Sequence, residues 1–147
     1  MLSSNFETVI KLEDLYNRLN TSPVQSVTIF LDACFSGSVC NDCILAKARG
    51  VKIQPKPDVM KGNLIVFSAA TGDETAFPYE DKQHGLCTYF LLKKLQDTEG
   101  NANYQTLSDY FIENVKKQSV LVNNKTQIPQ VNTSPAVNDT WQMMKLK

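Results

Sequence analysis

Apolar residues recur at regular spacings along most of this chain. Between residues 11 and 20, leucines and a tyrosine recur at spacings of three and four, which predicts an amphipathic helix. Pro23 ends that pattern. The nearly all-apolar run Val27–Leu31 follows, and its β-branched residues favour a strand. Such a run is typical of a strand that is buried on both faces inside a parallel sheet.

Four more elements are predicted downstream. Residues 63–68 form a second apolar run of the strand type, followed by a small and acidic turn. Helical periodicity covers residues 85–95 and 106–117. Residues 127–131 fit an edge strand, because Pro129 lacks the N–H that a central strand needs. Strands and helices in this order predict an α/β protein.

The composition narrows the class of protein. A chain of 147 residues that is 42% hydrophobic and 20% charged has the size and composition of one globular domain. Its 15 basic and 15 acidic residues cancel, so no positive field gathers nucleic acid or anionic lipid. No apolar run reaches the roughly 18 residues of a membrane span, and the first residues lack the pattern of a signal peptide. We expect no nucleic-acid or membrane partner, and a cytoplasmic location.

The four cysteines, at positions 34, 40, 43 and 87, form no complete metal-binding pattern. Cys40 and Cys43 have ligand-like spacing, but no second Cys pair or His pair completes a tetrahedral set. We therefore expect no metal and no other cofactor. The two residues are interpreted as thiols in a loop, with a redox pair as the alternative. That loop, residues 38–62, is long, polar and basic, and loops of this size are usually functional or disordered.

Three motifs lie at the ends of the predicted strands and at the start of the following helix. They are Asp32-Ala-Cys34-Phe-Ser36-Gly37, Ser68-Ala-Ala-Thr-Gly-Asp73-Glu-Thr75 and His84-Gly-Leu-Cys-Thr-Tyr-Phe-Leu-Leu92. In this order they resemble the caspase and metacaspase clan of cysteine peptidases, across about residues 10–131. The bacterial metacaspase-like branch is the most similar, because true caspases carry Gln-Ala-Cys where this chain has Asp-Ala-Cys.

The resemblance implies that Cys34 is the catalytic nucleophile. A thiol at the carboxyl end of a strand is accessible to substrate, and its own backbone N–H would supply half of an oxyanion hole. Gly37 would let the following turn approach closely. The alternative, from the residues alone, is a buried cysteine at a strand end that behaves as a small hydrophobic residue.

In metacaspase-like enzymes, the Asp two residues before the nucleophile lines the pocket for the substrate residue that precedes the cut. The resemblance gives this role to Asp32, whose carboxylate would select Arg or Lys and repel acidic side chains. Ser68 matches a polar position of that pocket, and Asp73 would add a second carboxylate. The alternative for Asp32 is a turn or capping carboxylate after a strand.

A cysteine peptidase also needs a histidine to take the thiol proton. The family's histidine lies roughly 50 residues before the nucleophile, and none of the residues that precede Cys34 is a histidine. The sole histidine, His84, comes after the nucleophile and opens a helix. We interpret His84 as non-catalytic, with an unusual base as the alternative. We therefore expect the C-terminal part of a three-layer α/β/α caspase-like domain with a mostly parallel sheet, whose upstream strands and base lie outside this chain.

The expected organisation is a peptidase part, residues 1–131, followed by a C-terminal tail, residues 132–147. Its unpaired strand would pair with a companion chain that holds the upstream strands, or with a second copy in a homodimer. The expected activity is endopeptidase hydrolysis of peptides or proteins after Arg or Lys, with autoprocessing in the loop at 38–62. The chain alone is expected to be inactive. The alternatives are a non-catalytic regulator or scaffold that binds a partner, and a redox-sensing cysteine cluster.

Overall fold

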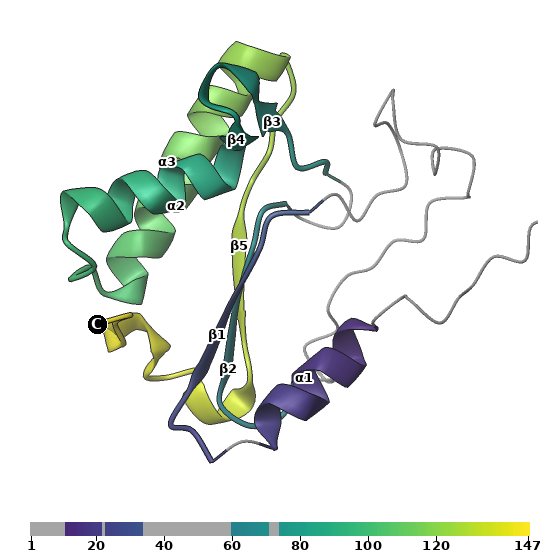
Figure 1. Cartoon of the computed structure of the whole chain (residues 1–147), viewed down its shortest axis with the longest axis vertical. Coiled ribbons are helices and arrows are strands. Elements are labelled where there is room, and N and C mark those ends of the chain that lie inside the picture. The colour runs from purple at the N-terminus through teal and green to yellow at the C-terminus, as the bar shows by residue number, and fades with distance from the viewer. Residues whose placement is uncertain (1–10, 22, 34–59, 71–73) are drawn as a thin grey trace, which may run out of the picture.

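The computed structural model describes residues 11–21, 23–33, 60–70 and 74–147. These residues form a mixed α/β structure in which a small sheet stands between helices (Figure 1). The α/β class predicted from the sequence is therefore confirmed. Within the described ranges, no helix is long and apolar enough to cross a membrane.

The described part of the sheet has three strands, in the order β1-β2-β5. β1 (Val27–Leu31) and β2 (Leu64–Ser68) run parallel, and β5 (Gln130–Thr133) runs antiparallel along the other side of β2. Both predicted apolar strands are thus present. This part of the sheet is mixed rather than mostly parallel, since one of its two strand pairs is antiparallel.

Burial differs between the three strands. All residues of β2 are buried, as expected for a central strand, whereas all residues of β1 are half-buried. β1 packs against apolar clusters on both faces, but its residues are less buried than its apolar pattern predicts, and β2 is the one described strand beside it. β5 lies at the opposite edge, as predicted for residues 127–131, and it begins just after Pro129.

Helices pack on both faces of the sheet. α1 (Leu12–Asn20) forms at the predicted position and packs on one face through Tyr16. The buried cluster on this face comprises Tyr16, Met60, Leu64 and Val66. Among the described residues, the buried cluster between α1 and the sheet is therefore small, and α1 contributes Tyr16 to it.

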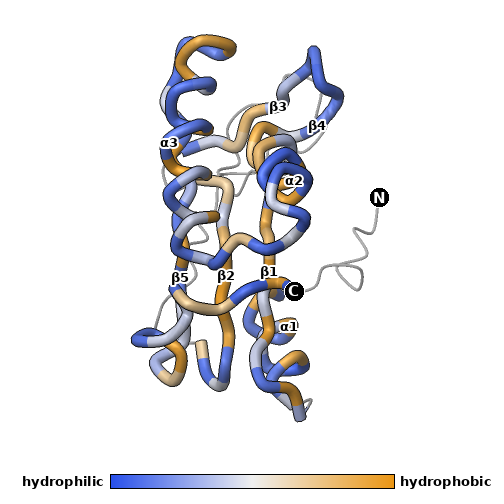
Figure 2. The backbone as a smooth tube through the Cα atoms, turned by 90° about the vertical axis from the view of Figure 1, so that its left-hand side faces the viewer, coloured by the Kyte–Doolittle hydropathy of each residue, from blue (hydrophilic) through white to orange (hydrophobic). Residues whose placement is uncertain are grey.

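The opposite face is covered by α2 (Leu86–Asp97) and α3 (Tyr104–Asn123), which lie side by side in Figure 1. Phe67 is the centre of the core on this face. Its ring stacks on that of Phe30, with 4.9 Å between the ring centroids. Its other ring neighbours, all edge to face, are Tyr104, Phe111 and Trp141. In Figure 2, β1 and β2 are largely hydrophobic, whereas the turn between β3 and β4 at the top is hydrophilic.

α3 is longer than the helix predicted over 106–117. Its start is set by Asn103, whose side-chain oxygen accepts a hydrogen bond from the backbone N–H of Thr106 at 2.8 Å. Its end is set by Asn124, which has a left-handed conformation with φ 56°. Valines near the end lower the helix propensity, but the helix continues through them because each added residue adds a hydrogen bond.

A short hairpin leads into α2. β3 (Pro78–Tyr79) pairs with β4 (His84–Gly85) around the single turn η4 (Glu80–Lys82). α2 starts at the next residue. His84 therefore lies in a strand, and the prediction that it opens the helix is wrong.

Residues 132–147, which the sequence sets apart as a tail, pack on the body of the protein. Two single turns, η5 (Pro135–Val137) and η6 (Trp141–Met143), each bring an apolar side chain onto the core below α2 and α3. These side chains are Val137, which is 4% exposed, and Trp141, which contacts the aromatic cluster. The end of the chain thus contributes to the same core as the sheet.

Candidate active site

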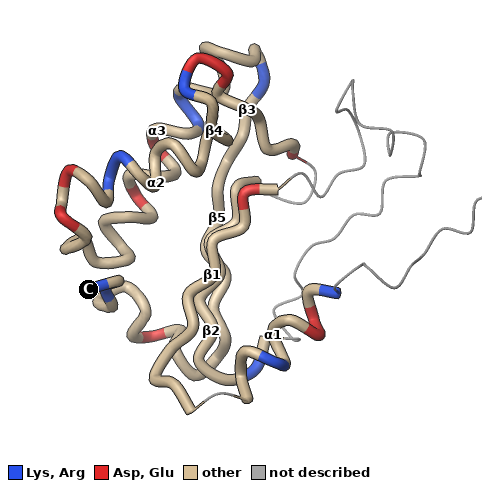
Figure 3. The backbone as a smooth tube through the Cα atoms, in the orientation of Figure 1, with Lys and Arg blue, Asp and Glu red and all other residues tan. Residues whose placement is uncertain are grey.

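The carboxyl ends of the two parallel strands lie together at one edge of the sheet. β1 ends at Leu31 and β2 ends at its register partner Ser68, and the backbone N–H of Ala69 donates to the Leu31 carbonyl at 2.8 Å. The strands β1, β2 and β5 carry no charged residue (Figure 3). The first charged side chain after β1 is that of Asp32, at this edge. Ligands collect at such carboxyl ends in α/β proteins.

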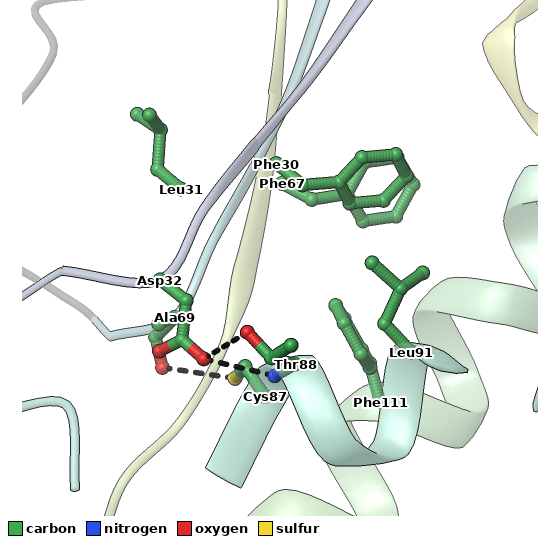
Figure 4. Close-up of a pocket in the computed structure, with 9 residues that line it drawn as sticks. All are labelled: Phe30, Leu31, Asp32, Phe67, Ala69, Cys87, Thr88, Leu91 and Phe111. Carbon is green, nitrogen blue, oxygen red and sulfur yellow. Dashed lines mark hydrogen bonds between the residues drawn. The ribbon is translucent and has the colours of Figure 1, made fainter. Parts of the chain in front are cut away.

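Asp32 is held by the first turn of α2. Its Oδ2 atom accepts two hydrogen bonds from Thr88, one from the backbone N–H at 2.9 Å and one from the hydroxyl at 2.6 Å (Figure 4). Thr88 is the third residue of α2, and the first N–H groups of a helix have no partner inside it. Asp32 therefore caps α2 from a distant part of the chain, a role that the sequence left open for it.

Gly85 makes this contact possible. A Cβ atom at position 85 would overlap Oδ2 of Asp32 and would lie 2.7 Å from its Cγ. Gly85 has φ −63°, which every residue can adopt, so close approach rather than backbone freedom requires a glycine here. The glycine of the His84-Gly85 pair is thus explained by the position of Asp32.

A small cavity lies beside the Asp32 carboxylate, between the strand ends and α2 (Figure 4). Asp32, Cys87 and Thr88 contribute to its wall, together with apolar side chains of the core. Its volume of about 50 Å³ corresponds to one or two water molecules, at ~30 Å³ each. The space between the strand ends and α2 is therefore too small for a whole Arg or Lys side chain.

A buried polar network secures the end of β2 behind this cavity. The Cys87 thiol donates to the Ala69 carbonyl at 3.6 Å, and Nε2 of Gln127 donates to the same oxygen at 2.8 Å. Gln127 is fully buried, and its Oε1 accepts from the backbone N–H of Phe77 at 2.9 Å. Burial and the nearby Asp32 carboxylate raise the pKa of the Cys87 thiol, against a smaller lowering by Gln127. Cys87 is therefore a protonated, structural thiol near neutral pH.

Asp32 and Ser68 lie on opposite faces of the sheet. In Figure 4, Leu31 points away from Phe30 and Phe67, and its register partner Ser68 shares that orientation. Ser68 is 3% exposed, and its hydroxyl has no hydrogen-bond partner among the described residues. The structure therefore does not bring these two predicted pocket residues together, because they occupy opposite positions of the strand alternation.

Several predicted functional positions lie outside the described residues. These are Cys34, Asp73, and the 38–59 part of the predicted loop, which contains Cys40 and Cys43. In the part of the chain that the structure does describe, no group of three or more His, Cys, Asp or Glu side chains is placed to hold a metal ion. Asp32 and Ala33 are the last described residues before Cys34 in the sequence.

His84 and Asp32 face different regions. Neighbouring residues of a strand point to opposite sides, and in β4 the Cβ direction of Gly85 is the one that meets Asp32. His84 instead lines a separate groove of about 450 Å³ along α2, together with Lys82 and Lys93. Cys34 lies outside the described residues, so the interpretation of His84 as non-catalytic stays a prediction.

Sequence reasoning missed three residues of this region. Gly85 and Thr88 belong to a quoted motif, but nothing in their local sequence indicates that their partner is Asp32. Gln127 lies in a polar segment without periodicity, which hides a fully buried side chain. The position of Gln127, two residues before Pro129, is only a weak indication that its side chain is buried.

Comparison with known proteins assigns no family to this chain. No family model matches it, and neither the search of curated proteins nor that of solved structures found a significant match. The function therefore has to be argued from the motifs and from the geometry of the carboxyl edge of the sheet.

Proposed function

We propose that this chain is the C-terminal part of a caspase-like cysteine endopeptidase of three-layer α/β/α architecture, which hydrolyses peptide bonds after Arg or Lys. Cys34 is the nucleophile. Its thiolate attacks the scissile carbonyl carbon, and its own N–H stabilises the oxyanion that forms. The protonated base gives its proton to the leaving amine, and water then hydrolyses the thioester to release the acid product.

The observation that carries this proposal is the position of Asp32. This residue, two places before Cys34 in the sequence, lies at the joint carboxyl edge of β1 and β2 and bonds to the start of α2. All three motifs of the resemblance contribute to this region, through Asp32, Ala69 and Thr88. Motifs that are far apart in the sequence are expected to converge in this way if they form one site.

The proposed preference for basic residues depends on the Asp32 carboxylate. Both hydrogen bonds from Thr88 reach Oδ2, and within the described residues none reaches Oδ1. We propose that Oδ1 accepts a charge-assisted hydrogen bond from a substrate guanidinium or ammonium group. Ser68, on the opposite face, and Asp73, outside the described residues, are proposed as further substrate-binding residues on the resemblance alone.

The catalytic base is proposed to come from a companion. The sole histidine of the sequence points away from Asp32, as described above. β1 is half-buried, and within the described residues β2 is its one strand neighbour. We propose that the other edge of β1 pairs with a partner strand. A companion chain with the upstream strands would pair there and bring the base, whereas a second copy of this chain would pair without supplying it.

A non-catalytic regulator or scaffold is the second candidate. The sequence favours it, because no histidine precedes Cys34 and the sole histidine, His84, is interpreted as non-catalytic. In this case the edge of β1 would bind a partner without hydrolysis. The two candidates differ in whether any form of the protein cleaves peptides.

Peptide hydrolysis by the chain joined to its upstream sequence tests the proposal. We expect cleavage of fluorogenic peptides after Arg and Lys, and a loss of roughly a thousandfold or more in Cys34→Ala. The matched control Cys40→Ala and the variant His84→Ala should keep full activity. Cleavage only after Asp, or activity that survives Cys34→Ala, contradicts the proposal. A folded joined form that cleaves no peptide favours the regulator.

Autoprocessing is a separable part of the proposal. The 38–62 loop carries the basic residues Lys47, Arg49, Lys52, Lys56 and Lys61. Mass spectrometry of the incubated joined form should find cuts after one or more of them. An intact loop in an enzyme that cleaves peptides would contradict autoprocessing alone.

A further inference from the structure

We infer that Thr88 is a positioning residue for substrate specificity, which orients the Asp32 carboxylate so that Oδ1 is left for a basic substrate side chain. This inference rests on the proposed function. Thr88 acts through Asp32 and makes no contact with the substrate. Its effect is therefore on the choice between charged and neutral substrates, not on the covalent steps.

The geometry of the two hydrogen bonds fixes the carboxylate. Both donors belong to Thr88 and both meet the same oxygen, at 2.9 Å from the backbone nitrogen and 2.6 Å from the hydroxyl oxygen. The backbone donor cannot follow a moving carboxylate, because it is part of α2. Rotation of the carboxylate would break both bonds, so Thr88 and the helix hold it in one orientation.

The surroundings of Asp32 decide from which side a cation can arrive. Towards α2, the carboxylate meets Gly85, where not even a Cβ fits, and a cavity of about 50 Å³. Neither space admits a guanidinium group with its alkyl stem. We therefore place the approach of a basic side chain on the side away from Thr88, and no hydrogen bond from a described residue reaches Oδ1.

Removing the hydroxyl of Thr88 isolates its positioning role. Thr88→Val keeps the β-branched shape and the backbone N–H but loses one of the two donors to Oδ2. The carboxylate is then held by the backbone donor alone, so it is less tightly oriented and Oδ1 is less well aligned with the substrate cation. Thr88→Ser is the matched control, because it keeps the hydroxyl and removes only a methyl group.

Competing substrates give the readout. The joined form is assayed with two peptides that carry either Arg or citrulline, its neutral analogue of the same shape, before the cut. We expect wild type to prefer Arg. In Thr88→Val, we expect kcat/KM for the Arg peptide to fall about tenfold, through KM, and that for the citrulline peptide to change less than about twofold. Thr88→Ser should retain the wild-type ratio.

The possible failures are distinguishable. A Thr88→Val variant that keeps the wild-type ratio, or that loses both substrates equally, overturns the role of Thr88 while peptide cleavage stands. A wild-type enzyme that cleaves neither peptide overturns the proposed function and this inference with it. If Thr88→Val does not fold by circular dichroism, Thr88→Ala takes its place. Benzamidine, an arginine mimic, should also bind Thr88→Val about tenfold more weakly than wild type in calorimetry, and equal binding contradicts the role.

Discussion

On the face covered by α2 and α3, the core of the described structure comprises 12 buried residues, whereas the cluster on the α1 face comprises four. The two faces also differ in how the polar groups at the strand ends are hydrogen-bonded. Asp32 receives two hydrogen bonds from α2 on the first face, whereas the hydroxyl of Ser68 is buried on the second without a described partner. The carboxyl edge is thus organised from one side, and α2 is the element that orients its charge.

The largest expected effect compares two neighbouring residues of β2. Phe67 points to the α2 and α3 face and Val66 to the α1 face, and they are 1% and 0% exposed. Phe67→Ala should lower the free energy of unfolding by about 4 kcal/mol, because its ring is the centre of the aromatic cluster. Val66→Ala should cost about 2 kcal/mol. Urea unfolding measures both, and equal costs would contradict the contrast between the faces.

The next effect tests the contact between Gly85 and Asp32. Gly85→Ala should lower the free energy of unfolding by about 2 kcal/mol, because the new Cβ pushes the carboxylate off Thr88. In an Asp32→Ala background, the same change should be neutral or slightly stabilising, since the backbone at 85 suits alanine. Wild type, the two single variants and the double variant form a double-mutant cycle. Chemical denaturation of these four proteins gives the coupling energy between residues 85 and 32. If Gly85→Ala lowers the free energy of unfolding equally with and without Asp32, the contact between Gly85 and Asp32 does not explain the glycine.

A smaller effect concerns the buried thiol of Cys87. Its pKa in the folded protein is raised, chiefly by burial, above the value of an unfolded cysteine. The unfolded state therefore loses the thiol proton first as the pH rises. The stability that depends on the neutral thiol is complete below about pH 8.5 and falls above it, by about 1 kcal/mol between pH 9 and 10.

The control for this pH dependence is Cys87→Ala. The difference in stability between wild type and this variant should shrink over that interval, because the variant has no thiol to titrate at this position. Thermal or urea unfolding at pH 7, 8, 9 and 10 provides the comparison. A difference that stays constant with pH would show that Cys87 is not protected from ionisation.

The smallest effect has the opposite sign. Ser68→Ala removes a buried hydroxyl that has no described partner, so stability should stay the same or rise by less than ~1 kcal/mol. Ser134→Ala is the matched control, because its buried hydroxyl donates to the Gly62 carbonyl and accepts from the N–H of Leu64. This control should lose about 1–2 kcal/mol. A comparable loss of stability in Ser68→Ala would mean that the Ser68 hydroxyl has a hydrogen-bond partner outside the described residues.

Much of the fold was predictable, because local patterns determine it. The helix near residues 11–20, both apolar strands and the first half of α3 follow from hydrophobic spacing. The half-burial of β1 does not follow from its apolar pattern, because it depends on which strands lie beside it. The length of α3 was underestimated, since valines in its last turn mask a helix that Asn103 and Asn124 delimit.

The position of Asp32 was predictable, but its contacts were not. The motif placed Asp32 at the end of a strand, where it lies. The pairing of Asp32 with Thr88 joins residues far apart in the sequence, and no local pattern encodes such a contact. The separation of Ser68 from Asp32 follows from strand alternation together with the register of Leu31 and Ser68, which only the sheet reveals.

The central claim, that Cys34 is the nucleophile of a peptidase specific for basic residues, is tested most directly by covalent labelling. An Arg chloromethyl ketone is added to the chain alone and to the chain joined to its upstream sequence, and mass spectrometry locates the product. The thiolate displaces chloride and forms a thioether. We predict one label per molecule, on Cys34, in the joined form and none in the chain alone. If neither form reacts, the peptidase account is contradicted and the non-catalytic regulator becomes the better explanation.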